Sequence, residues 1–248
     1  MRAKHVQKGS QDGFIKDVQK QGKKRASPQP FSLSSLQSAM NYHASASQIL
    51  AAIQSLYEAK LLSYPRTDCA YITDEEFDYL VANLTKYLGL VSKPVALTNT
   101  TPNKRYVDGE KVEEHYAIIM TKVVPTKEKL ASLPKLQQQV YDLVLRTTLA
   151  MFADPYEYEE TTIITQVGDV NFKATGKVPT KQGWQDLFDD HKADQQVAAN
   201  LPLVHRGDQV KANLQTPQKE TEVCQMVLKD SFYPLEISSC GRSFLLFY

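Results

Sequence analysis

Apolar residues recur at helical spacing in the first half of the chain, and this pattern predicts two helices. Residues 47–60 place their apolar side chains at i, i+4, i+7 and i+8, which is one face of a helix. These side chains are Ile49, Ile53, Leu56 and Tyr57. Ser47 is a suitable N-cap, and a shorter helix is predicted to begin near Ser34. The two helices form a helix-turn-helix candidate, although any small helical bundle also contains such a pair.

Two further helices are predicted downstream. Thr73 and Glu76 fit a capping box at the start of a helix that should end at Gly89. Residues 134–152 show the strongest helical pattern, and their leading proline suits a first turn. The polar stretch 92–112 between these helices predicts a loop.

β-branched and aromatic residues dominate the second half of the chain, so a β-rich unit is predicted there. The Gly-Asp pair at 168–169 marks a turn between two strand-like runs, and a second strand pair is predicted around 206–208. The predicted fold class is therefore α+β. A helical unit spans residues 30–154, and a β-rich unit spans 155–222.

The two ends of the chain differ from these units. Residues 1–29, with a short strand predicted around 13–18, are expected to be a basic arm or connector. This arm carries eight Lys/Arg and two Asp, whereas the rest of the chain carries 21 basic and 26 acidic side chains. A basic arm on a slightly acidic body suggests an anionic partner, and a solvated tail is the alternative. Residues 223–248 have no clear period and form an atypical tail.

Composition excludes several classes of protein. Of the 248 residues, 42% are hydrophobic and 23% are charged, which excludes a disordered chain, a collagen and a coiled coil. No apolar run approaches the ~18 residues of a membrane helix, and no apolar core follows the basic N-terminus, so a cytoplasmic protein is expected. Cys69, Cys224 and Cys240 lack CxxC or zinc spacing, which predicts idle or buried thiols and no metal site.

The segment around Tyr64 and Arg66 carries candidate chemistry. The two residues are separated by one position on an extended segment that follows a helix, so their side chains should point to one side. A tyrosine hydroxyl is a nucleophile when activated, and a guanidinium matches the geometry of a phosphate. The spacing alone is more typical of a packed tyrosine and a surface arginine near a turn.

Longer motifs favour the chemical interpretation. LYEAKLLSYPRTDC closely resembles the active-site segment of type IA DNA topoisomerases, especially the bacterial topoisomerase III branch. FSLSSLQSAMN, VEEHYAIIMT, YDLVLRTTLAMFADPYEYEETTI, the segment from Gly176 to Trp184, and LPLVHRGDQV resemble further motifs of that family in the same order. The resemblance covers about residues 28–215.

The resemblance implies a fold and a reaction. Residues 30–154 would be the winged-helix-like domain that carries the nucleophile, and the β-rich unit would be part of the arch of the toroid. Tyr64 would attack single-stranded DNA to give a 5′-phosphotyrosine, without ATP, so that a second strand passes before religation. Arg66 would hold the scissile phosphate, and His115 would lie near it. Gln37, Asn41, Arg66 and Thr67 are the DNA-binding residues implied by the same motifs.

The sequence departs from the family pattern in four places. Cys69 stands where serine is usual, and Met120 stands where proline is usual. The Toprim domain, which holds Mg²⁺ and contributes further catalytic groups, does not fit into 29 residues, and the expected segment after residue 217 is missing. Because such groups act as a unit, the isolated chain is expected to be an inactive internal fragment.

Three functions stay open at this point. The first is a topoisomerase fragment that acts on single-stranded DNA, with a possible separately encoded Toprim-containing chain and a location on the nucleoid or a plasmid. The second is a stand-alone winged-helix DNA-binding module. The third is a non-functional remnant.

Overall fold

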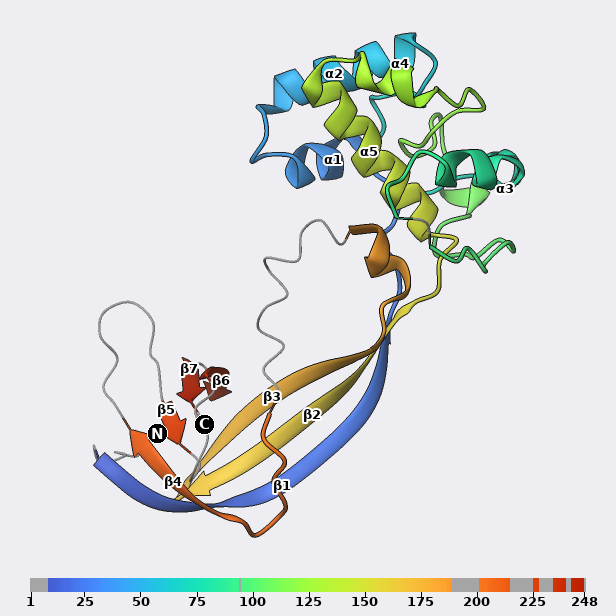
Figure 1. Cartoon of the computed structure of the whole chain (residues 1–248). Coiled ribbons are helices and arrows are strands. Elements are labelled where there is room, and N and C mark those ends of the chain that lie inside the picture. Colours follow the sequence, from blue (N-terminus) through green and yellow to red (C-terminus); the bar gives the residue numbers. More distant parts are fainter. Residues whose placement is uncertain are drawn as a thin grey trace. The chain divides into compact units, whose positions relative to one another are not determined.

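The structure, a computed structural model, describes residues 9–93, 95–188 and 201–214, together with the backbone of three short strands beyond them (Figure 1). The chain divides into two units. A helical unit comprises Arg25–Tyr156 and Gln182–Asp190, and a sheet unit comprises Met1–Lys24, Glu157–Lys181 and His191–Tyr248. The predicted boundary between the helical and the β-rich unit, after residue 154, lies two residues from the division after Tyr156. The sequence did not predict that residues 182–190 belong to the helical unit.

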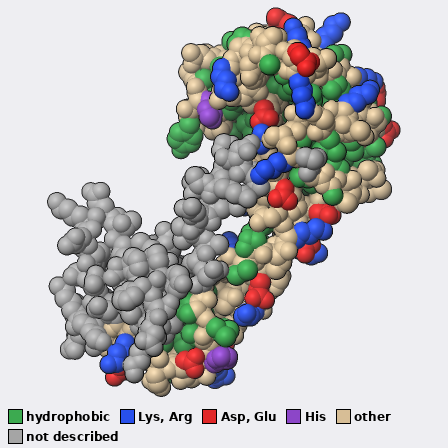
Figure 2. Space-filling view, viewed as in Figure 1, with side chains coloured by type: hydrophobic (Ala, Val, Ile, Leu, Met, Phe, Trp, Pro, Cys, Tyr) green, Lys and Arg blue, Asp and Glu red, His purple; other side chains and the backbone are tan. Residues whose placement is uncertain are grey.

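In the part that the structure describes, the helical unit has five α-helices, which are α1 (Leu33–Ala39), α2 (Ala46–Glu58), α3 (Asp74–Leu88), α4 (Lys127–Ala131) and α5 (Lys135–Ala150). The helix α5 packs against both α2 and α3, and α1 packs against α2 (Figure 1). A single 3-10 turn, Gly109–Lys111, interrupts the predicted loop over 92–112. On the face shown in Figure 2, Lys and Arg side chains of this unit are interspersed with Asp and Glu.

Serine caps fix where the first two helices begin. Ser45 caps α2, and its side chain forms a capping box with Gln48. The prediction that Ser47 is the cap is wrong, because a capping box needs its partner three residues downstream of the cap, and Gln48 stands there for Ser45. Ser32 caps α1 in the same way, so that helix begins at Leu33, one residue from the predicted start near Ser34.

The predicted capping box of α3 is confirmed. The backbone N–H of Thr73 donates to Glu76 Oε2 over 3.2 Å, and the Thr73 hydroxyl donates to the same carboxylate oxygen. The helix ends at Leu88 with Gly89 as its C-cap, as predicted. The predicted helix over 134–152 is confirmed as α5, with Pro134 as its N-cap and not in its first turn, and it ends at Ala150.

The core of the helical unit lies where the predicted apolar stripes meet. Ile49, Ile53 and Leu56 of α2 are all fully buried, and they belong to one cluster with the buried face of α5. Tyr57 departs from the predicted stripe, because 39% of its surface remains exposed. Within the described residues, no helix is both long enough and apolar enough to cross a bilayer.

Within the described residues, the sheet unit has seven strands in the order β5-β4-β1-β2-β3-β6-β7. The strands are β1 (Gly9–Arg25), β2 (Tyr156–Val167), β3 (Val170–Lys181), β4 (Gln209–Leu214), β5 (Gln225–Val227), β6 (Pro234–Ser239) and β7 (Arg242–Phe247). The hairpin of β2 and β3 turns at Gly168, whose φ of 56° is the left-handed conformation that glycine accepts. This turn was predicted, and the predicted α+β class is confirmed.

The prediction that residues 1–29 form a basic arm or connector is wrong for residues 9–25. Residues 9–25 form the long strand β1 inside the sheet, and Ile15 is fully buried in the smaller core with Ile163 and Val210. Three of its lysines pair with carboxylates of the neighbouring strand. The pairs are Lys20–Glu159, Lys23–Glu160 and Lys24–Glu157. Three of the eight positive charges that suggested an anionic partner are therefore offset by the adjacent strand, which the order of residues along the chain does not reveal.

The strand pair predicted around 206–208 is half correct. Only Gln209–Leu214 is a strand, and it pairs antiparallel with β1. The residues before it turn, because His205 and Asp208 hydrogen-bond to each other and Gly207 has a φ of 94°. In the tail 223–248, the described backbone extends the sheet through β5, β6 and β7. Cys224 and Cys240 lie outside the described residues, and Cys69 is a free, half-buried thiol.

Candidate active site around Tyr64

The end of α2 sets the position of the candidate nucleophile. The N–H of Lys60 donates to the Tyr57 carbonyl over 2.8 Å, and the N–H of Leu61 donates to the Leu56 carbonyl over 2.9 Å. These two bonds form a Schellman motif, which ends the helix and turns the chain. The turn requires a left-handed residue, and Lys60 supplies it with a φ of 60°. A lysine in this conformation costs roughly 1 kcal/mol more than a glycine.

The chain after this turn is held against a second segment, residues 115–121. Leu62 forms an antiparallel bridge with Met120, and the N–H of Ser63 donates to the Ile119 carbonyl over 2.9 Å. Met120 is fully buried in this bridge, and its carbonyl accepts a hydrogen bond from the Tyr79 hydroxyl over 2.8 Å. The residue that departs from the family pattern therefore has a defined place in the core.

The hydroxyl of Ser63 ties the two segments together beside Tyr64. It donates to the Ala117 carbonyl over 2.9 Å and accepts from the Ile119 N–H over 2.9 Å. Ser63 is 5% exposed, and both partners are fully buried. One side chain therefore satisfies a buried donor and a buried acceptor of the neighbouring segment.

Thr67 holds the backbone of His115. Its hydroxyl donates to the His115 carbonyl over 3.0 Å and accepts from the Cys69 N–H over 3.1 Å. The Cys69 thiol in turn lies 3.5 Å from the carbonyl oxygens of Tyr71 and Lys111, so this departure keeps a weak donor in place. Thr67 is 5% exposed, and its contacts are those of a residue that positions His115.

Burial alternates along the segment that contains Tyr64. Ser63, Pro65 and Thr67 are buried, whereas Tyr64 is half-buried and Arg66 is exposed. Tyr64 and Arg66 therefore share the outward side, as their spacing predicts. They do not line the same cavity, because the backbone bends at residues 65 and 66.

Tyr64 lies in a cavity of about 330 Å³. Its ring contacts the ring of His115, with centroids 4.1 Å apart and planes tilted by 40°. Tyr57 meets Tyr64 edge-on at 5.6 Å. The cavity is lined by Tyr57, Lys60, Leu62, Ser63, Tyr64, His115, Tyr116 and Thr121. Burial raises the pKa of Tyr116 above that of a free tyrosine.

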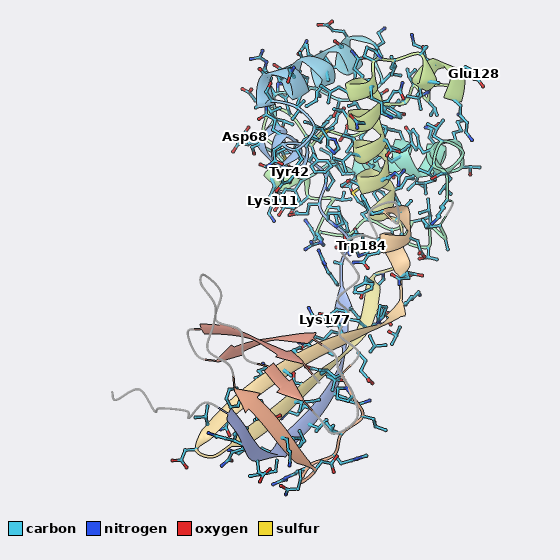
Figure 3. The ribbon with its side chains drawn as sticks, turned by 60° about the vertical axis from the view of Figure 1, so that its left-hand side comes forward. Tyr42, Asp68, Lys111, Glu128, Lys177 and Trp184 are labelled. Carbon is cyan, nitrogen blue, oxygen red and sulfur yellow. The ribbon has the colours of Figure 1, made fainter. Side chains whose placement is uncertain are left out.

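Arg66 lines a neighbouring cavity of about 360 Å³ that shares His115 with the first. Its other lining residues are Thr67, Asp68, Cys69, Lys111, Glu113 and Glu114. Lys111 also pairs with Asp108 over 3.3 Å and lies 4.4 Å from the centre of the Tyr71 ring. Hydrogen bonds from Gln29 and Lys111 lower the pKa of Tyr71. Asp68 and Lys111 are labelled in Figure 3, both on the helical unit.

The structure brings some predicted site residues together and separates others. Tyr64 and His115 are in contact, although the chain separates them by 51 positions, and Arg66 lines the second cavity together with His115. Gln37 and Asn41 line neither cavity. The Gln37 amide donates to the Ala46 carbonyl over 2.9 Å and ties the end of α1 to the start of α2. A DNA-binding role for these two residues stays a prediction.

Lys60, Tyr57 and Tyr116 line the first cavity but were not predicted as site residues. The sequence carries a signal for Tyr57 alone, as a polar-tipped residue in an otherwise apolar stripe.

The described side chains around the two cavities do not form a suitable site for Mg²⁺. Asp68, Glu113 and Glu114 line one cavity, yet across the part of the chain that the structure describes no three His, Cys, Asp or Glu side chains are grouped to hold a metal ion.

The chain belongs to the DNA topoisomerase family, whose model matches residues 2–229. It is 32% identical over 220 residues to DNA topoisomerase 3 of Bacillus licheniformis, covering 83% of this chain and 29% of that protein. The same identity holds over 210 residues with DNA topoisomerase 3 of Bacillus subtilis, covering 78% and 28%. The resemblance to type IA enzymes of the bacterial topoisomerase III branch is thereby confirmed.

The fold agrees with a solved member of the family. Full-length topoisomerase I from Thermotoga maritima matches with a TM-score of 0.60 at 22% identity, over 81% of this chain and 33% of that one. The chain spans about 29% of the length of the curated relative from Bacillus licheniformis.

Proposed function

We propose that this chain is the part of a type IA topoisomerase that carries the DNA-cleaving tyrosine. The observation that supports this most is the contact between Tyr64 and His115 in a cavity that adjoins the one lined by Arg66. A tyrosine oxygen, an imidazole and a guanidinium within neighbouring cavities suit attack on a phosphodiester.

The proposed reaction is a reversible transesterification at a DNA phosphodiester. The Tyr64 oxygen loses its proton and bonds to the phosphorus of single-stranded DNA, while the bond to the 3′ oxygen breaks. The 3′ oxygen takes up a proton, and the 5′ end stays on the protein as a phosphotyrosine. Religation reverses these steps, so no nucleotide cofactor is required.

Each neighbouring group has a proposed part in this step. Arg66 offsets the charge of the phosphate with its fork of N–H donors. His115 packs on the Tyr64 ring and presents its imidazole where the phosphate would enter, and Thr67 holds its backbone. The proposal also includes a separately supplied Toprim-containing chain that brings Mg²⁺. The expected location is the nucleoid or a plasmid.

Covalent trapping of labelled DNA tests the proposal. The full chain is incubated with a separately expressed Toprim domain, magnesium and a single-stranded oligonucleotide labelled at either end, and then run on a denaturing gel. The label at the 3′ end should stay with the protein, and Tyr64→Phe should abolish this signal. Arg66→Ala should slow adduct formation by about 10²–10³, because it removes charge stabilisation but keeps the nucleophile.

Tyr57→Phe is the matched control. It removes a hydroxyl from the same cavity and keeps the ring that meets Tyr64. An adduct that persists in Tyr64→Phe, or that retains the 5′ label, would refute the assignment. A stand-alone DNA-binding module would bind the oligonucleotide and form no adduct under any condition.

A further inference from the structure

Lys60 stands out from the rest of the described backbone. It is the one non-glycine residue there with a positive φ, at 60°. Its position in the Schellman motif at the end of α2 accepts glycine without strain, and glycine would make the same two hydrogen bonds. The backbone motif therefore does not explain why a lysine occupies this position. Strained residues of this kind cluster at functional sites.

Lys60 lines the cavity that contains Tyr64. Among the described residues, no Asp or Glu lines that cavity, whereas the cations Arg66 and Lys111 share theirs with Asp68 and two glutamates. A carboxylate competes with DNA phosphate for a cation, so the first cavity offers the less compensated positive charge. This contrast points to an anionic ligand for Lys60.

The backbone around Lys60 is fixed on both sides. Its N–H donates to the Tyr57 carbonyl over 2.8 Å, and its own carbonyl accepts from the Thr121 hydroxyl. These bonds fix the direction in which the side chain leaves the backbone. A cation on such a support is better oriented toward a ligand than one on a free loop.

We propose that Lys60 binds a backbone phosphate of single-stranded DNA in the Tyr64 cavity, next to the phosphate that Arg66 contacts. The two cavities meet at His115, so one strand that passes Tyr64 would meet Lys60 on one side and Arg66 on the other. This inference rests on the proposed function and adds a residue that orients the strand. Lys60 makes no bond to the reacting atoms and is a positioning residue.

A helix-end role is the competing explanation, since a cation near the end of α2 also offsets the negative end of the helix dipole. That role changes stability and leaves DNA affinity and its salt dependence unchanged. The two explanations are therefore separated by measuring binding and thermal unfolding on the same variants.

Fluorescence anisotropy of a labelled oligothymidylate with the full chain, over a series of NaCl concentrations, tests the proposal. Lys60→Gln should weaken binding about three- to tenfold and reduce the slope of log K against log salt by about 0.7, the value for one phosphate contact on a single strand. Lys60→Arg should bind as the wild type does, because it keeps the charge. Lys86→Gln is the control, since this exposed lysine of α3 lines neither cavity.

Lys60→Gly removes the charge and the backbone strain together. It should lose as much affinity as Lys60→Gln while its thermal midpoint stays at or above that of Lys60→Gln. Wild-type affinity in Lys60→Gly would show that any loss in the glutamine variant came from folding and would overturn the proposal.

Failure of this inference is distinguishable from failure of the proposed function. If Arg66→Gln weakens binding but Lys60→Gln leaves affinity and slope unchanged, the role of Lys60 is wrong and the proposed function stands. If the wild type shows no salt-dependent binding to the oligonucleotide, both are refuted.

Discussion

The hydroxyl of Ser63 makes a sharp test of how the site is held together. Ser63→Ala removes a donor to the Ala117 carbonyl and an acceptor for the Ile119 N–H, and both of these partners are fully buried. A buried polar group left without a partner costs about 1–3 kcal/mol. The two orphaned groups together should lower the free energy of unfolding by about 2–4 kcal/mol, after some relaxation of the loop.

Urea unfolding measures this loss in the helical unit. Trp184 is the single tryptophan of the chain, is 7% exposed, and belongs to this unit. Its indole N–H donates to the Arg25 carbonyl over 3.0 Å, so its fluorescence should change when the unit unfolds. With a slope of about 2 kcal/mol/M, the midpoint should fall by about 1–2 M urea.

Ser55→Ala is the matched control for this measurement. Its hydroxyl lies on the exposed side of α2 and bonds to the Ala51 carbonyl of the same helix over 3.1 Å. Its replacement should change stability by no more than about 0.5 kcal/mol. A change in Ser63→Ala as small as that of the control would refute the view that this hydroxyl joins the Tyr64 segment to its neighbour.

Three further outcomes are expected. Gly183→Ala should lower the free energy of unfolding of the helical unit by about 2–5 kcal/mol in the same Trp184 assay. The reason is that Gly183 has a φ of +53° and that a Cβ there would lie 2.4 Å from two backbone oxygens. A loss below about 1 kcal/mol would contradict this. Burial raises the pKa of Tyr87 to about 12 from 10.0, so the folded state keeps this proton longer than the unfolded chain. The stability that the protonated Tyr87 hydroxyl contributes should be complete below pH ~10 and be lost as the pH rises through ~12. This loss should be measured as alkaline unfolding with a parallel rise in tyrosinate absorbance, and Tyr87→Phe should reduce both. Thr67→Val should lower the rate of adduct formation more than the affinity for oligonucleotide, because it releases the carbonyl of His115 and leaves the cations in place; equal loss in both would argue against a positioning role.

Local patterns in the sequence determined four of the five described α-helices and most of their ends, whereas α4 was not predicted. The apolar stripe of α2, the Thr73–Glu76 capping box and the Gly89 stop depend on residues within four positions of one another, and such signals survive without tertiary context. The one error in this group, Ser47 for Ser45, arose where alternating serines offer several caps, and the partner at Gln48 decides between them.

Tyr64 and Arg66 were likewise identified from a contiguous motif. Their outward direction follows from strand alternation, and burial on either side of each confirms it. The motif did not reveal that Tyr64 and Arg66 line two different cavities. The backbone bend between them depends on the packing of residues 115–121 against this segment, which the motif does not contain.

Only the tertiary structure decided which distant residues meet. The contact of His115 with Tyr64 depends on backbone bonds between residues 61–67 and 115–121, and pairings of such long separation leave no periodicity in either segment. The same holds for the lysines of β1, whose charge is offset by β2 across the sheet. Lys60 is the clearest case, since a lysine at a helix end is ordinary in sequence, and its left-handed backbone and its place beside Tyr64 exist only once the chain has folded around it.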